Sequence, residues 1–221
     1  MRATTDRSPL IPYVVQRKGE EAAPDNLRIL EFAPGRHRLY YADENPQRDR
    51  DMRGVLWARC AFNPADENRM PTGEPQWKMM HPHRQMVTMQ HLRCQVCTRQ
   101  ARTRLGYIFL AGRGNQDPTQ AQILTNQPPV CAQHAPAAAQ LCPHLAGDPI
   151  VFLAHSAPLY GVGGVLYGRN SSGVHVVARP DHALPYGHPN LETFLASQMV
   201  RRLSSFRVVS LEELLKELAA A

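Results

Sequence analysis

Four residues in the middle of the chain have the types and spacing of metal ligands. Cys94 and Cys97 form a Cys-x-x-Cys pair, and Cys131 and His134 form a Cys-x-x-His pair further along. Thiolate sulfur and imidazole nitrogen are donors that zinc prefers, and two such pairs complete a tetrahedral set. The sequence therefore predicts a zinc site made by these four side chains.

The second pair lies in a local sequence that can aim both ligands at one ion. Residues 128–130, Pro-Pro-Val, favour an extended chain, and the alanine-rich residues after Cys131 favour a helix. Pro136 would fall in the first turn of this helix, where a missing N–H group costs little. We therefore expect Cys131 and His134 to lie about one turn apart on one face, in the first turn of the helix.

The segment between the two pairs favours a hairpin. Residues 105–111 are typical of a strand, and residues 112–118 are typical of its turn. A tight Cys-x-x-Cys turn, a hairpin and a helix start, in that order, are the layout of a treble-clef zinc finger. Because the predicted ligand set leaves no open position, we expect a structural zinc ion rather than a catalytic one.

Two other interpretations of the cysteines remain open from the sequence alone. Cysteines can be small apolar core residues, and a Cys-x-x-Cys pair can be a redox pair. Cys142 and His144 are further ligand candidates, but Cys142 lies about 16 Å along a straight helix from Cys131. We interpret Cys142 and Cys60 as core residues.

Composition favours a folded protein in a reducing setting. The 221 residues are 43% hydrophobic, which is enough for a packed core without disulfides. Five cysteines with metal-like spacing, and no signal-peptide pattern, predict a cytoplasmic protein. No apolar run approaches the roughly 20 residues needed to cross a bilayer. We expect no membrane partner and no small-molecule cofactor.

The predicted zinc module is the most basic part of a chain whose net charge is +6. Asp117 is the only acidic residue between Pro75 and Gly147. A zinc ion with three thiolates would add only about one negative charge, so the module stays positive. If nucleic acid is a partner, we expect six arginines to be its phosphate contacts: Arg84, Arg93, Arg99, Arg102, Arg104 and Arg113.

We expect three segments, packed as one unit. Residues 1–76 contain strand patterns at 10–16, 27–32, 38–42 and 55–61, which predict a small antiparallel sheet. Residues 77–147 contain a helix that Pro82 opens, followed by the zinc module. Residues 148–221 contain a strand at 149–154, a hairpin over 161–178, a helix over 191–203, a short strand at 206–209 and a last helix over 211–220. Ser210 and Glu213 form a capping-box pattern for that last helix. The predicted fold is thus α+β, with small antiparallel sheets, a central treble-clef-like zinc module and C-terminal helices.

A weak pattern for catalysis lies near the end of the chain. Asp181, His182 and Asn190 resemble the core of HNH nucleases, in which treble-clef zinc scaffolds are common. The cysteine pairs lie well upstream here, however, and no histidine occurs in residues 191–202. The glycines of residues 161–168 match neither a dinucleotide fingerprint nor a P-loop, and we interpret them as allowing close packing in a strand.

Several strings resemble a group of actinobacterial proteins that carry a treble-clef-like zinc finger. These strings are His81-x-x-Arg84-Gln85-Met86, Cys94-Gln95-Val96-Cys97, Pro128-Pro129-Val130-Cys131-x-x-His134, residues 141–145, Tyr41–Glu44 and Gly54–Arg59. The resemblance implies a zinc-binding protein and no particular activity. We expect a zinc-stabilised, non-enzymatic binding protein with nucleic acid as its partner. The alternatives are a protein-interaction module and, less well supported, a nuclease.

Overall fold

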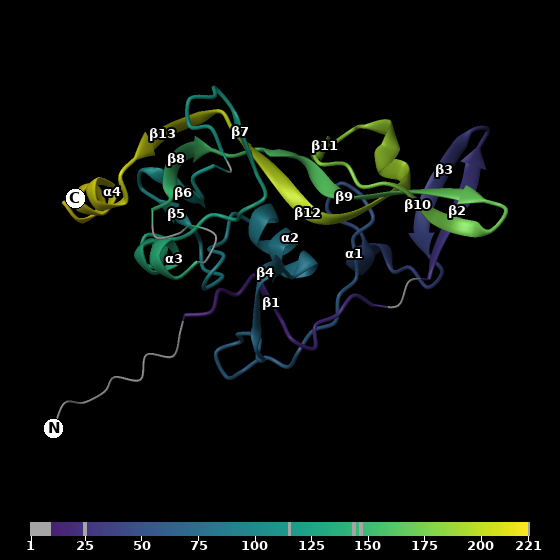
Figure 1. The fold of residues 1–221 in the computed structure, drawn as a ribbon, viewed down its shortest axis with the longest axis horizontal. Coiled ribbons are helices and arrows are strands. Elements are labelled where there is room, and N and C mark those ends of the chain that lie inside the picture. Colours follow the sequence, from purple (N-terminus) through teal and green to yellow (C-terminus); the bar gives the residue numbers. More distant parts are fainter. Residues whose placement is uncertain (1–9, 24–25, 115, 143–144, 146–147, 221) are drawn as a thin grey trace.

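The computed structural model describes residues 10–23, 26–114, 116–142, 145 and 148–220. It confirms a mixed fold of helices and small antiparallel sheets (Figure 1). The elements in chain order are β1 Val15–Arg17, β2 Leu27–Ala33, β3 Arg36–Tyr41, α1 Pro46–Asp49, β4 Pro75–Met80, α2 Pro82–Gln90, β5 Arg102–Thr103, β6 Gly106–Ala111, β7 Ile123–Thr125, α3 Ala135–Leu141, β8 Ile150–Ser156, β9 Leu159–Asn170, β10 Gly173–Ala178, β11 Leu184–Pro185, the 3-10 helix η1 Pro189–Thr193, β12 Phe194–Leu203, β13 Ser205–Val209 and α4 Leu211–Ala219.

Strand pairing joins segments that lie far apart in the sequence. One sheet has the order β10-β9-β12-β7, with β11 beside β9, and a second has the order β13-β8-β6-β5. The pairs β1-β4 and β2-β3 form two smaller sheets. Strands β6 and β7, between the two ligand pairs, join β8 and β12 from the last third of the chain. The three predicted segments are therefore connected through shared sheets.

Helix α2 packs against β12 near the middle of the molecule (Figure 1). Its helical spacing places Met86 and Met89 on one side, where both are buried against Phe194 and Met199 of β12. Pro82 occupies the first turn, where its missing N–H group costs no helical hydrogen bond. Since α2 ends at Gln90, its anchorage also sets the position of the metal-ligand turn that follows.

The predicted helix over residues 191–203 is wrong. After the short η1, residues 194–203 form strand β12, which pairs with β9 along most of its length. Gly164 of β9 lets the two backbones approach, because a Cβ atom there would overlap the carbonyl oxygen of Leu195. The apolar residues of β12 recur at intervals that also suit a helix, but sheet pairing and burial on both faces decide the structure.

The N-terminal region differs from the predicted four-stranded sheet. Only β2 and β3 form a regular hairpin, and β1 is limited to three residues that pair with β4. Residues 55–61 form isolated bridges instead of a strand, including Trp57 beside Ala196. The charged residues before this segment include Asp49, at the end of α1, and Asp51, both of which are buried. Asp49 pairs with Arg59, and Asp51 accepts hydrogen bonds from backbone N–H groups and from Tyr186.

The last helix begins as its capping pattern predicts. Ser210 Oγ accepts a hydrogen bond from the Glu213 N–H group at 3.1 Å, and it donates one to the Glu213 carboxylate at 2.8 Å. Leu214 is fully buried in the apolar cluster that surrounds the metal ligands. Helix α4 therefore closes the core around the four predicted ligands.

Candidate metal centre

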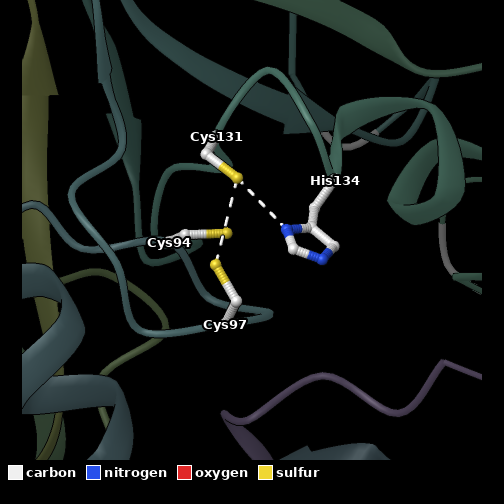
Figure 2. A group of neighbouring side chains, drawn as sticks. All are labelled: Cys94, Cys97, Cys131 and His134. Atoms are coloured by element: carbon white, nitrogen blue, oxygen red, sulfur yellow. Dashed lines mark hydrogen bonds between the residues drawn. The ribbon is translucent and has the colours of Figure 1, made fainter.

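The structure brings the four predicted ligands together. Cys94, Cys97, Cys131 and His134 offer donor atoms that all lie within 4.8 Å of one another. Figure 2 shows the three sulfur atoms and one imidazole nitrogen directed toward a common point. This group could hold a metal ion, and all five cysteines are free thiols.

Cys94 and Cys97 lie in a tight turn just beyond α2. The Thr98 N–H group donates to the Cys94 carbonyl oxygen at 2.9 Å, and the Cys94 N–H group donates to the Arg99 carbonyl oxygen at 2.8 Å. Thr98 has a φ of 62°, a left-handed conformation that reverses the chain. These constraints direct both cysteine side chains to the same side of the turn.

Cys131 and His134 lie in a turn that leads into α3. Val130, just before them, forms a bridge with Ile108 of β6, so the chain enters the turn in an extended conformation. The N–H groups of His134 and Ala135 both donate to the Cys131 carbonyl oxygen at 3.0 Å. His134 is the N-cap of α3, so the two ligands precede the first turn of the helix. The sequence predicts them within that turn, and this detail of the prediction is wrong.

The spacing of the donor atoms fits a tetrahedral ion. With metal–sulfur bonds of about 2.3 Å and metal–nitrogen bonds of about 2.0–2.1 Å, donor atoms lie about 3.5–3.8 Å apart. The sulfurs of Cys97 and Cys131 are 4.0 Å apart, and Cys131 Sγ lies 3.2 Å from His134 Nδ1. Both distances are far longer than a disulfide bond and lie on either side of the tetrahedral value. These two distances are compatible with a metal ion held by the ligand group.

The protonation states of the ligands couple metal binding to pH. Burial raises the pKa of the Cys94 thiol, although backbone hydrogen bonds from Cys131, Cys97 and Val96 oppose that rise. Burial likewise raises the pKa of the Cys97 thiol. Burial and the nearby charge of Arg99 lower the pKa of His134, which favours the neutral imidazole that a metal requires. A bound metal must therefore displace thiol protons, with little competition at the histidine.

The two remaining cysteines lie outside the centre. Cys142 is the C-cap residue of α3, and Cys60 contacts the Glu20 carbonyl oxygen in another part of the molecule. Neither belongs to the ligand group. His144, the other additional candidate, lies outside the described residues.

The predicted phosphate contacts divide into three groups. Arg93, Arg99 and Arg102 are exposed around the metal centre and have no acidic partner within the described ranges. Arg104 is exposed and hydrogen-bonds the carbonyl oxygen of Glu217, and Arg113 is exposed and pairs with Asp148 at 2.7 Å. Arg84 is the exception, and its position corrects the prediction.

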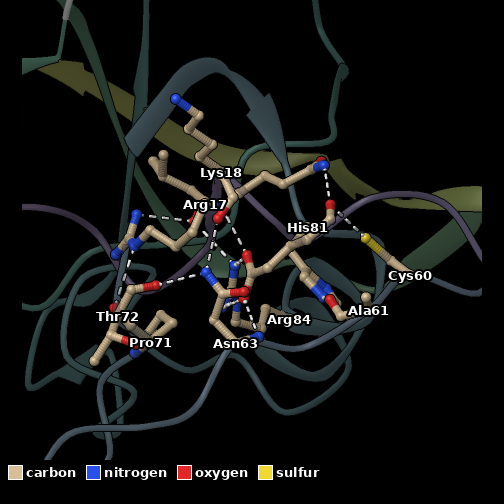
Figure 3. A network of polar contacts seen from close by, with 12 residues as sticks. Arg17, Lys18, Cys60, Ala61, Asn63, Pro71, Thr72, His81 and Arg84 are labelled. Atoms are coloured by element: carbon tan, nitrogen blue, oxygen red, sulfur yellow. Dashed lines mark hydrogen bonds and ion pairs between the residues drawn. The ribbon is translucent and has the colours of Figure 1, made fainter. Parts of the chain in front are cut away.

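Arg84 is buried in a polar network at the start of α2 (Figure 3). Its guanidinium forms an ion pair with Glu20, which is fully buried, and also donates to the Val15 carbonyl oxygen. Arg17 and His81 are buried in the same network. Because α2 turns Arg84 toward the protein interior, this residue cannot contact a nucleic acid phosphate.

The residues that resemble a nuclease core do not form one. Asp181 and His182 line one surface pocket, whereas Asn190 lines another. The segment after Asn190 continues into strand β12, where the nuclease motif requires a helix. The structure therefore gives the nuclease interpretation no support.

Comparison of the chain with protein families, with functionally characterised proteins and with solved structures finds no match.

Among the described residues, no helix is both long enough and apolar enough to span a membrane. The chemistry of the ligand group and of the surrounding surface is therefore the basis for assigning a function.

Proposed function

We propose that Cys94, Cys97, Cys131 and His134 bind a structural zinc ion. The observation that supports this proposal is the convergence of three thiols and one imidazole from two separate turns. A bound zinc ion would supply four bonds that cross-link the end of α2 to the start of α3, and no ligand position would remain for a substrate. The ion would thus stabilise the core formed by Ile108, Val130 and their neighbours.

Metal analysis of the purified protein tests this assignment. We expect about one zinc ion per chain, and loss of zinc in Cys94→Ser combined with Cys97→Ser. That double variant should also unfold at a temperature lower by roughly 6–12 °C, since this is the effect of losing about 3 kcal/mol of stability in a chain of this size. Cys142→Ser is the matched control, because it removes a neighbouring thiol outside the ligand group. Full zinc content in the double variant would refute the assignment.

We further propose that the zinc-stabilised module is a non-enzymatic binding surface for nucleic acid. Support comes from the zinc face, which we define as Arg93, Arg99 and Arg102. These arginines are exposed, lie within five residues of Cys94 or Cys97 in the sequence, and lack acidic partners among the described residues. Their charges are available to phosphates, and the ion would keep their backbone positions fixed.

Fluorescence anisotropy with labelled DNA and RNA, measured at several salt concentrations, tests the nucleic-acid proposal. We expect affinity to fall steeply with salt, and Arg99→Ala with Arg102→Ala to weaken binding and flatten the salt dependence. Arg179→Ala with Arg202→Ala removes the same charge from exposed positions elsewhere and is the matched control. Equal affinity for the two double variants would contradict the proposal.

A second candidate is a protein-interaction module. Met79 and Leu141 are 51% and 46% exposed, and both line a cavity of about 420 Å³ beside the metal centre. Apolar side chains at the rim of a groove favour a protein partner over a nucleic acid. Absence of nucleic acid binding at low salt would favour this candidate, with Met79 and Leu141 as the expected contacts.

A further inference from the structure

A basic groove lies at the end of the molecule opposite the candidate metal centre. In Figure 1 the β2-β3 hairpin is at the right end, whereas α3 and α4 are at the left end. The hairpin, the loop at residues 50–55 and the segment 186–193 line a groove of about 1220 Å³. We call this feature the hairpin groove. It uses none of the residues of the zinc face.

The lining of the hairpin groove carries a strong excess of positive charge. It contains four arginines, Arg36, Arg38, Arg50 and Arg53, but only one acidic residue, Glu192. Arg36 pairs with Glu192, and Arg50 pairs with Glu44 at 2.7 Å. Arg38 and Arg53 are exposed and have no ion pair within the part of the chain that the structure describes. Both are therefore available to an anionic ligand.

Exposed apolar and aromatic surfaces adjoin these charges. Leu30 and Phe32 of β2 are 54% and 46% exposed, and both line the groove. The Arg36 guanidinium lies 4.7 Å from the centre of the Phe32 ring. On the other side of the groove, Arg53 lies 5.4 Å from the centre of the Tyr186 ring. The groove thus presents an exposed aromatic ring and apolar surface beside cationic side chains.

Hydrogen bonds to Asp51 connect two of the segments that line the groove. The Tyr186 hydroxyl donates to Asp51 Oδ2 at 2.5 Å. Asp51 Oδ1 accepts hydrogen bonds from the N–H groups of Arg53 and Val55, each at 2.9 Å. These bonds connect the loop that carries Arg53 to the segment that carries Tyr186. The Tyr186 ring and the backbone at Arg53 are consequently held in place before any ligand arrives.

We propose that the hairpin groove binds single-stranded nucleic acid, with phosphates at Arg38 and Arg53 and a base stacked on Phe32. Charge complementarity favours a polyanion, and the exposed Phe32 ring favours unpaired bases, because a duplex keeps its base faces stacked inside. This inference rests on the proposed nucleic-acid function but depends on different residues. It specifies the strand state of the ligand and adds a second contact surface.

Anisotropy titrations of a labelled 20-nucleotide oligo(dT) and of a duplex of equal length test this inference in the full chain. We expect Arg38→Ala with Arg53→Ala to reduce the salt slope for the single strand by about 1.4, since each phosphate contact contributes about 0.7. We expect Phe32→Ala to weaken single-strand binding by roughly 5-fold to 100-fold at every salt concentration. Arg179→Ala with Arg202→Ala should leave the single-strand affinity within about 2-fold of the unmodified chain. Thermal unfolding of each variant checks that these exposed substitutions preserve the fold.

The outcomes separate this inference from the proposed function. Loss of binding in Arg99→Ala with Arg102→Ala, combined with unchanged binding in both hairpin variants, would overturn the inference and leave the zinc face as the binding surface. Loss of binding only in Arg38→Ala with Arg53→Ala and in Phe32→Ala would support the inference. It would also refute the proposal that the zinc face binds nucleic acid. Stronger binding to the duplex than to oligo(dT), or no binding to either, would overturn the inference.

Discussion

Replacing Glu20 by glutamine should destabilise the protein far more than an ordinary change of one charge. The Glu20 carboxylate accepts hydrogen bonds from the Arg17 N–H group at 2.7 Å, from Arg84 Nη1 at 2.8 Å and from the Asn63 N–H group at 3.3 Å. The Glu20 side chain is 0% exposed and that of Arg84 is 3% exposed. Glutamine keeps the shape of the side chain but removes the charge that balances Arg84.

The expected magnitude follows from the burial of this pair. Removal of one partner from a buried ion pair costs about 3–5 kcal/mol, because the remaining charge is left without compensation. Arg17 is also buried nearby, so Glu20→Gln leaves two guanidinium groups with no carboxylate between them. We therefore expect the free energy of unfolding to fall by about 3–5 kcal/mol, measured by urea denaturation.

Two further variants make the result interpretable. Glu212→Gln breaks the exposed pair with Lys216, whose side chains are 78% and 72% exposed, and should cost less than about 0.5 kcal/mol. Glu20→Gln combined with Arg84→Met removes both charges of the buried pair and should cost at least about 2 kcal/mol less than the sum of the single changes. If Glu20→Gln costs no more than Glu212→Gln, our argument that Glu20 compensates a buried charge is wrong.

Three smaller perturbations test other parts of the structure. Burial and the charge of Arg84 lower the pKa of His81 from 6.5 to about 4. Between pH 4 and pH 6.5 the unfolded chain therefore binds more protons than the folded chain, so the free energy of unfolding should fall as the pH drops through this range. His81→Gln should reduce that loss by about 1–3 kcal/mol in urea titrations across this range, and an unchanged pH slope would contradict the assignment. Gly164→Ala should cost about 1–3 kcal/mol, because its Cβ atom overlaps the backbone where β9 meets β12, and an unchanged urea midpoint would contradict that contact. Ser210→Ala should cost about 1 kcal/mol through loss of the α4 cap, whereas Ser210→Asp should retain most of the stability in the same assay.

The metal ligands could be predicted from the sequence because their chemistry is local. Spacing alone identified two pairs of ligands, and the structure brings Cys94, Cys97, Cys131 and His134 within reach of one ion. The helix opened by Pro82 and the cap at Ser210 were predictable for the same reason, because each depends on a few adjacent residues. Zinc as the bound ion and the treble-clef layout remain predictions.

Long-range contacts explain where the sequence analysis failed. Residues 191–203 have a helical pattern, but pairing with the glycine-containing β9 makes residues 194–203 a strand, and nothing in the local sequence indicates that partner. Arg84 belongs to a basic region, yet Glu20, far away in the sequence, draws it into the interior. The hairpin groove was missed because its arginines are joined there by residues 186–193, which lie more than 100 residues further along the sequence. Its only local signal was the run Arg36-His37-Arg38 after a strand.

The order of the strands relative to the ligands has a consequence for how the chain folds during synthesis. All four ligands have been synthesised once residue 134 is in place, whereas β8, β12 and β13, which complete the two larger sheets, follow between residues 150 and 209. Strands β6 and β7 must therefore wait for partners that come later in the chain. During this interval the ligand group can already close the loop from residue 94 to residue 134 around an ion. The metal would then protect the open edges of β6 and β7 from aggregation until their later partners emerge from the ribosome.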